Sequence, residues 1–172
     1  MAMPMSHDNE ERKRAEQKAR LVMFLKKIPL FEDLPVPTLR KILGICSKVA
    51  LDEGQYLCKK DDPSNAMYIL LTGKLAVKVG GSAPVATIEP VNSIGEMGVF
   101  TGEPRTATVQ AMQKSALLLL QRNELNHLIK RDTDFGVKIM SKVIRILADR
   151  IADDNKRMRE FQKYIISQES GS

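Results

Sequence analysis

The segment SIGEMGVFTGEPRTATV, residues 93–109, contains the opposite charges Glu96 and Arg105 among mostly small and apolar residues. Glu96 follows Gly95, and Arg105 stands further along the same segment. Backbone N–H groups at a glycine turn can bind an anion, and the Arg105 guanidinium matches a phosphate, with the Thr106 hydroxyl beside it. An ionised carboxylate only accepts hydrogen bonds, so Glu96 suits a ligand hydroxyl. One phosphate and one hydroxyl describe a ribose phosphate; the simpler alternative is a Glu–Arg pair that bridges a surface loop.

The elements that must position these side chains change from helical to extended along the chain. Strong helix formers over residues 8–27 predict a first helix, and the apolar spacing in PVPTLRKILGICSKV predicts a second, short one. From Leu51, short apolar runs are separated by clusters of Gly, Pro, Asn and Asp, which predicts an all-β roll or barrel. These runs are GQYLC, AMYILL, LAVKV, VATI, TATVQAM and SALLLLQ.

A helical period returns past Arg122, where we expect Asn123 to cap a short helix and Asp134 to cap a long one. The long helix carries a heptad seam with the acidic Asp154 inside it. This seam predicts either parallel self-association or a helix whose first half packs on the β-roll and whose second half is merely amphipathic. A carboxylate at a seam position costs stability unless it finds a partner. The seam consists of Met140, Ile144, Leu147, Ile151, Asp154, Met158, Phe161 and Ile165.

Composition narrows the class of protein. The 172 residues are most simply one domain with accessory helices, and 43% hydrophobic with 28% charged residues is ordinary for a soluble globular chain. No apolar run approaches the roughly 20 residues of a membrane span, and the N-terminus shows no apolar leader, so we expect a cytoplasmic protein without membrane attachment. Much of the net charge of +6 lies in residues 12–27 and 156–163, which also carry glutamates. Mixed charge favours solvated helix faces over a nucleic-acid surface.

Catalytic and metal-binding patterns are missing from the sequence. The histidines are His7 and His127, and no Ser/His/Asp or metal-ligand spacing accompanies them, so we predict neither an enzyme nor a metal cofactor. Cys46 and Cys58 stand in apolar or strand-like surroundings, which favours buried reduced thiols over a disulfide.

The stretch GEMGVFTGEPRTATV resembles the phosphate-binding cassette of the cyclic nucleotide-binding domain family. This module is found in bacterial catabolite activator proteins, protein kinase A regulatory subunits and cyclic nucleotide-gated channels. IPLFEDLPVPTLRKIL is similar to the family's entry helices, and GQYLCKKDDPSNAMYILLTGKLAV is similar to its early strands. The similarity covers about residues 22–152. It implies an α+β fold, in which an antiparallel β-roll of the double-stranded jelly-roll type is flanked by N-terminal helices and a long C-terminal helix.

The resemblance also implies a role for each matching residue of the cassette. Glu96 would bind the ribose 2′-hydroxyl, and Gly95 would allow close approach of the backbone. Arg105 would pair with the cyclic phosphate. The Thr106 side chain and backbone N–H groups near Thr106 and Ala107 would assist it.

The purine would be read outside the cassette. Met97 would give the nucleotide apolar contact, and in the catabolite activator branch polar residues of the long helix reach the base; by register these are Asp154 and Asn155 here. Alternatively, Asp154 is a solvated residue on a frayed seam. Guanine offers an N1–H and an amine that suit a carboxylate, so Asp154 favours cGMP, and Thr106 could also reach the guanine amine. Because cAMP is the usual ligand of bacterial relatives, we favour cAMP slightly and keep cGMP.

The sequence departs from the family pattern at a few positions. Asp61 stands where a strand turn usually has glycine, and aspartate tolerates left-handed geometry. Val91 and Asn92 replace a frequent Gly-Asp pair, where asparagine can serve the turn. Met97 and Gly98 sit where the family often has bulkier aliphatic residues, which bears on affinity more than on ligand class.

These expectations describe a cyclic nucleotide sensor whose C-terminal helix moves when ligand binds and also forms a homodimer. We divide the chain into a helical extension (1–26), the β-roll (27–133) and a hinge or dimerisation helix (134–168). No DNA-binding domain, kinase or channel segment is evident, so we expect a stand-alone sensor or the regulatory piece of a longer protein, such as a transcription regulator. The alternatives are a ligand-free protein-interaction module on the same scaffold and DNA binding by the basic helices.

Overall fold

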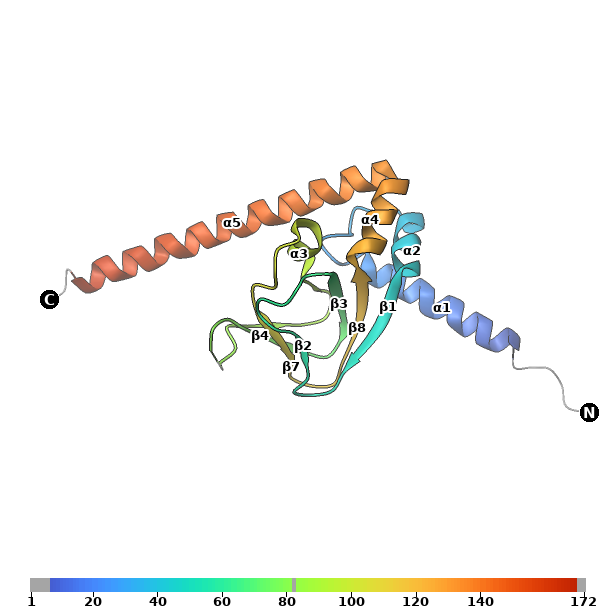
Figure 1. The fold of residues 1–172 in the computed structure, drawn as a ribbon, viewed down its shortest axis with the longest axis horizontal. Coiled ribbons are helices and arrows are strands. Elements are labelled where there is room, and N and C mark those ends of the chain that lie inside the picture. The colour runs from blue at the N-terminus through green and yellow to red at the C-terminus, as the bar shows by residue number, and fades with distance from the viewer. Residues whose placement is uncertain (1–6, 82, 170–172) are drawn as a thin grey trace, which may run out of the picture.

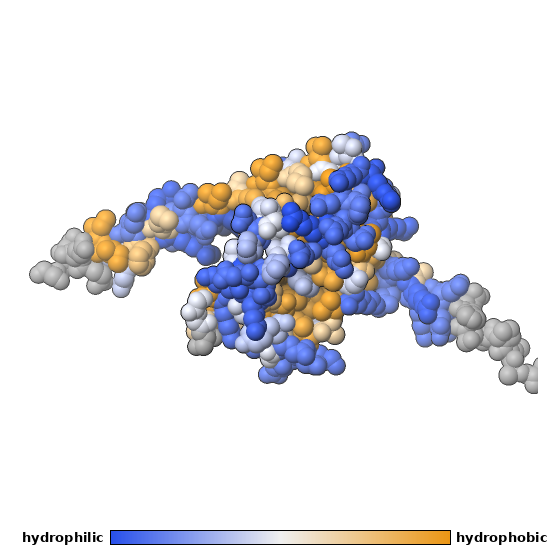
Figure 2. All heavy atoms as spheres, in the orientation of Figure 1, coloured by the Kyte–Doolittle hydropathy of each residue, from blue (hydrophilic) through white to orange (hydrophobic). Residues whose placement is uncertain are grey.

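The computed structural model describes residues 7–81 and 83–169. Figure 1 shows the strands gathered in the centre, with α1 projecting from one end of the roll and α5 passing over it and reaching beyond the opposite end. The visible surface of α1 is mostly hydrophilic, whereas hydrophobic residues are visible along α5, including the part beyond the roll (Figure 2).

Along the described part of the chain, two helices precede the strands, one lies between two strands, and two follow the last strand. A proline opens α2, because Pro35 holds the extended backbone (φ −67°, ψ 149°) that precedes a helix, and a second proline falls within the first turn. The first helix agrees with the predicted one. The bounds are α1 (His7–Leu25), α2 (Val36–Gly44), α3 (Glu96–Thr101), α4 (Arg122–Arg131) and α5 (Thr133–Glu169).

The strands of the described residues pair into two four-stranded antiparallel sheets. One sheet has the order β1-β8-β3-β6 and the other β2-β7-β4-β5, so strands that are neighbours in space are mostly far apart in the sequence. The prediction of an antiparallel β-roll of jelly-roll type with flanking helices is confirmed. The strands are β1 (Cys46–Leu51), β2 (Tyr56–Cys58), β3 (Ala66–Thr72), β4 (Leu75–Lys78), β5 (Ala86–Ile88), β6 (Ser93–Ile94), β7 (Thr108–Ala111) and β8 (Ser115–Gln121).

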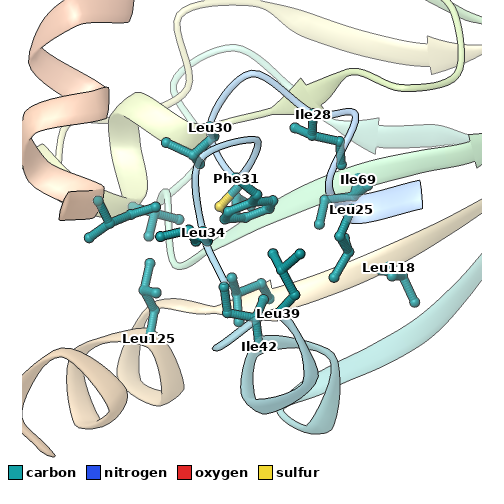
Figure 3. Close-up of a cluster of buried hydrophobic side chains, with 14 of the residues drawn as sticks. Leu25, Ile28, Leu30, Phe31, Leu34, Leu39, Ile42, Ile69, Leu118 and Leu125 are labelled. Carbon is teal, nitrogen blue, oxygen red and sulfur yellow. The ribbon is translucent and has the colours of Figure 1, made fainter. Parts of the chain in front are cut away.

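The main hydrophobic core joins the helices to the first sheet. Figure 3 shows Phe31 surrounded by apolar side chains from the N-terminal helices, from β3 and β8, and from α4. The first turns of α5 enter the same cluster through Phe135, Ile139 and Val143. A smaller apolar cluster, which includes Leu70 and Leu117, fills the space between the two sheets. The first turns of α5 therefore belong to the main core, on one side of the roll.

Strand β1 was not predicted from the sequence. The expected second helix ends at Gly44, and Cys46–Leu51 then pairs along its whole length with β8, from Cys46 opposite Leu120 to Leu51 opposite Ser115. Most of its residues are exposed or half-buried, since β1 is an edge strand of its sheet. Because its residues do not alternate between apolar and polar, the sequence pattern did not indicate a strand at Cys46–Leu51.

Both expected helix caps were wrong. Gln121, with extended backbone and no capping side-chain hydrogen bond, precedes α4, and Asn123 lies inside that helix. The carboxylate of Asp132 accepts a hydrogen bond from the Phe135 N–H (3.1 Å) at the start of α5, so Asp134 falls in the first turn. Either aspartate satisfies the sequence rule for a cap, and only the backbone path decides between them.

Two turns have left-handed backbone at residues other than glycine. Asp61 has φ 69°, which confirms that aspartate takes the place of glycine there. In the second turn, Val91 and not Asn92 is left-handed, with φ 73°. This is an unfavourable conformation for a β-branched residue, and Val91 packs its side chain against the main core. Asn92 serves the turn differently, by donating its side-chain N–H to the Glu89 carbonyl (3.0 Å).

Candidate functional site

The cassette begins at a glycine that no other residue could replace without strain. Gly95 precedes α3 with left-handed backbone (φ 79°, ψ 19°). A Cβ atom added to Gly95 would lie 1.7 Å from Nη1 of Arg105. The missing side chain therefore lets the Arg105 guanidinium lie directly against the turn that leads into α3.

Arg105 is buried, with only 7% of its surface exposed. Its Nη2 donates to the Ala66 carbonyl, and its guanidinium lies 5.6 Å from the Tyr68 ring centroid. Within the part of the chain that the structure describes, its Nε and Nη1 are buried and have no acceptor. Main-chain bonds fix the residue, because its N–H donates to Asp62 (2.9 Å) and its carbonyl accepts from Asp61 (2.8 Å). The result is a fixed cation with spare donors.

Glu96 is the second buried charge of the cassette, with 5% of its surface exposed. It opens α3, where a carboxylate is favoured by the helix dipole. Its Oε1 accepts from Nη2 of Arg150, a residue of α5 whose side chain is 51% exposed. Nη1 of Arg150 lies 3.4 Å from the Met97 sulfur. The cassette and the long helix are thus joined by a partly buried ion pair.

A cavity of about 690 Å³ opens between the cassette, the roll and α5. Its size is typical of a site for a small organic ligand. Apolar side chains from both sheets form part of its wall, and the two buried charges and Arg150 face into it. Every predicted cassette residue lines it: Gly95, Glu96, Met97, Arg105, Thr106 and Ala107.

The predicted base-reading residues lie elsewhere. Asp154 and Asn155 are exposed on α5 and are not among the residues that line the cavity. Arg150, one helical turn before Asp154, takes the place that they were expected to occupy. Sequence reasoning passed over Arg150: the sequence places it one helical turn before Asp154 but carries no signal of its contact with Glu96.

Ser64, which is buried, and Cys58, which is half-buried, lie next to the cassette in the cavity wall. The Ser64 side chain packs against α3 where Gly98 leaves room, since a Cβ at Gly98 would lie 1.9 Å from the Ser64 oxygen. The Cys58 thiol lies in the cavity wall and weakly contacts the Ala107 carbonyl (3.8 Å). Burial raises the pKa of Cys58, and raises the pKa of Cys46 to about 12, so both are protonated thiols. They are free cysteines, as predicted, but they are half-buried and not buried as expected.

The described residues contain neither a membrane-spanning helix nor a metal-binding cluster. Among residues 7–81 and 83–169, no helix is both long and apolar enough to cross a membrane. In the same part of the chain, no group of three or more His, Cys, Asp or Glu side chains is placed to hold a metal ion.

Residues 48–132 match a family model described as the cyclic nucleotide-binding domain. The chain contains a cyclic nucleotide-binding domain. Its family is one of regulatory, ligand-binding modules, as the cassette sequence suggested. The matched range contains all strands from β2 onward, the cassette and α4, whereas Arg150 lies outside it.

The cyclic nucleotide-binding domain is similar to domains of known structure from two regulatory proteins. The N-terminal domain of a transcriptional regulator from Streptomyces coelicolor A3(2) is similar, with a TM-score of 0.68 and 26% identity over 73% of this chain and 93% of that chain. The regulatory domain of Toxoplasma gondii PKA, solved with cAMP, is also similar, with a TM-score of 0.61 and 25% identity. That match covers 66% of this chain and 44% of the other.

The cyclic nucleotide-binding domain also matches part of an enzyme. A lysophospholipase from Neurospora crassa is 32% identical over 128 residues, which is 72% of this chain and 8% of the lysophospholipase. The chain spans between 8% and 28% of the length of this and the next curated relatives it matches. The shared module is therefore small beside the proteins that carry it.

Proposed function

We propose that the protein is a cyclic nucleotide sensor that binds cAMP or cGMP in the cassette cavity and transmits binding through α5. The observation that carries this proposal is Arg105, a buried residue of the cavity wall whose Nε and Nη1 have no acceptor among the described residues. Unpaired buried donors are costly, and charge-assisted bonds from arginine to phosphate are among the strongest in proteins. A cyclic phosphate would satisfy both donors.

The remaining cavity groups fit the rest of a cyclic nucleotide. Glu96 Oε2 makes no hydrogen bond to the described residues, so it is available for a ribose 2′-hydroxyl while Oε1 holds Arg150. Thr106 and Ala107 follow Arg105 at the rim and would add a hydroxyl and N–H groups to the phosphate site. The similar Toxoplasma gondii domain, solved with cAMP, supports the same ligand class.

Transmission would run through the Glu96–Arg150 ion pair. This pair joins α3 to α5 at the cavity wall, so a ligand that binds beside it contacts groups of both helices. A conformation of α5 that satisfies both the ligand and the ion pair would be favoured by binding. Asp154 and Asn155 lie further along α5, and a shift of this helix toward the cavity would be needed for them to meet the purine.

We also propose that two chains pair through α5. The seam residues beyond the roll are exposed, among them Ile151, Met158 and Phe161. Exposed apolar residues at heptad spacing are typical of a coiled-coil partner surface. A cytoplasmic location and the role of regulatory module in a larger system remain part of the same proposal, since the curated relatives are much longer than this chain.

Calorimetric titration with cAMP and with cGMP tests the ligand site. Arg105→Ala and Glu96→Ala are compared with the exposed-site controls Arg131→Ala and Glu124→Ala. We expect Arg105→Ala to weaken binding at least about a hundredfold, since it removes charge-assisted hydrogen bonds. Glu96→Ala should also weaken binding, and the controls should bind as the unmodified protein does.

Normal folding of the unmodified protein without affinity for either nucleotide would refute the sensor and favour the protein-interaction module. Equal binding by Arg105→Ala would move the site away from the cassette. Incubation with ligand followed by chromatography would detect turnover, which a sensor should not show. Salt-sensitive binding to any DNA duplex would instead support the alternative that the basic helices bind nucleic acid.

A further inference from the structure

Arg150 is the cationic side chain of α5 in the cavity wall, and it was outside the predicted site. We propose that Arg150 selects guanine over adenine, so that the preferred ligand is cGMP. This inference rests on the proposed function, because it concerns the base of a nucleotide whose phosphate and ribose the cassette holds.

Arg150 can turn donors to a ligand without losing its strong contact. Its Nη2 bonds to Glu96, while its Nη1 lies 3.4 Å from the Met97 sulfur. A thioether is a weak acceptor, so a carbonyl oxygen or ring nitrogen of a base would displace it readily. About half of the side chain is exposed to solvent, which leaves the guanidinium room to adjust.

Glu96 places this guanidinium beside the nucleotide. If the free carboxylate oxygen of Glu96 accepts the ribose 2′-hydroxyl, then Arg150, bonded to the other oxygen, lies next to the sugar. The phosphate would bind at Arg105, which lines the same cavity and has spare donors. A base attached to that sugar would lie in the same cavity, whose wall includes Arg150.

The chemistry of the two purines differs on the edge that an arginine reads. Guanine presents O6 and N7, two neighbouring acceptors, and arginine bound to this pair is the commonest specific contact to a base. Adenine presents N7 beside an amine, so one arginine donor would face another donor. A guanidinium cannot be deprotonated to relieve that conflict.

The other candidate readers leave this edge unread. Asp154 is exposed and outside the cavity wall, so in this structure it does not face a bound base. Thr106 lies beside Arg105 and could reach the guanine amine, which is on the opposite edge from O6 and N7. The contributions of Arg150 and Thr106 are therefore separable by removing one group at a time from the base.

The test compares three ligands: cAMP, cGMP and cyclic inosine monophosphate, which keeps O6 and N7 but lacks the amine of guanine. Each is titrated into the unmodified protein, Arg150→Met, Arg150→Lys and the control Arg157→Met, which alters an exposed arginine two turns further along α5. Circular dichroism confirms that each variant is folded.

We expect the unmodified protein and Arg157→Met to bind cGMP and the inosine nucleotide at least about tenfold more tightly than cAMP. Arg150→Met should bring the three affinities together, and Arg150→Lys should keep part of the preference. Equal affinities in the unmodified protein, a preference for cGMP that the inosine nucleotide does not share, or an unchanged preference in Arg150→Met would each overturn the inference. Absence of binding by all three ligands would refute the proposed function itself.

Discussion

The two halves of α5 carry similar apolar residues but meet different surroundings. In the first turns, Phe135, Ile139 and Val143 are buried in the main core together with the N-terminal helices and the roll. From Ile151 onward, the described side chains are all exposed, although isoleucine, methionine and phenylalanine recur there. Figure 1 shows why: the helix continues past the edge of the roll.

Arg150 lies where one half gives way to the other. The near half is held in the core by the three buried residues of its first turns, although its seam residues Met140 and Ile144 are exposed. In the far half, the described side chains of both the seam and the other faces are exposed. An apolar side chain stabilises the fold only where it is covered, so the same substitution should destabilise the near half strongly and the far half very little. This boundary is also where α5 contacts the cassette, through Glu96.

The largest expected difference comes from one residue type on one helix. Ile139→Ala should lower the free energy of unfolding by about 2–5 kcal/mol, because Ile139 is fully buried and the substitution leaves a cavity. Ile151→Ala should change the free energy of unfolding of the monomer by less than about 0.5 kcal/mol, since that side chain is 62% exposed. Urea unfolding at low protein concentration measures both.

A second prediction concerns the partner of the far half. The double variant Ile151→Ser/Phe161→Ser should weaken self-association at least about a hundredfold, because each side chain buries apolar surface in the proposed dimer. Sedimentation equilibrium over a concentration series measures the dissociation constant.

The matched control is Lys156→Ser/Lys163→Ser, which alters the face of α5 opposite the seam and should leave association unchanged. If the unmodified protein is monomeric at all concentrations, the far half of α5 does not pair with itself. The exposed seam would then need another occupant.

The same contrast separates what the sequence could predict from what it could not. The cassette was predictable because its chemistry is local: Gly95, Glu96 and Arg105 lie within one short segment, and the expected glycine turn is present at Gly95. Arg150 was not predictable, since it reaches Glu96 from 54 positions away. Its contact depends on the angle at which α5 crosses the roll, and heptad spacing contains no information about that angle.

The strands were also only partly predictable from the sequence. Strands β3 and β8 are central in their sheet and nearly continuous in apolar residues, so their positions were clear from the sequence. The edge strand β1 has little buried surface, and the sequence did not reveal it. Local patterns thus predicted buried elements well and half-exposed ones poorly. The seam of α5 is an example, since Met140 and Ile144 are exposed although the near half of the helix packs on the core through other residues.

The smallest expected effect tests the ionic contact that ties the near half of α5 to the loop after α1. Lys142 donates to Glu32 and to Asp33 (2.8 Å), and 11% of its side chain is exposed. Its hydrogen bond lowers the pKa of Asp33, and the hydrogen bonds to Asp33 and Glu32 raise the pKa of Lys142. Surface ion pairs contribute little, so Lys142→Met should lower Tm by about 2 °C or less at pH 7.

The pH dependence of that difference identifies its origin. A carboxylate with a depressed pKa in the folded state stabilises the protein above its unfolded value, near 3.8 for Asp33, and loses that contribution as pH falls through the folded value. The Tm difference between Lys142→Met and the unmodified protein should therefore shrink in acid. Lys156→Met, on the exposed far half, should match the unmodified protein at every pH. A difference that persists unchanged at pH 2 would assign the effect of Lys142 to packing of its aliphatic stem and not to its charge.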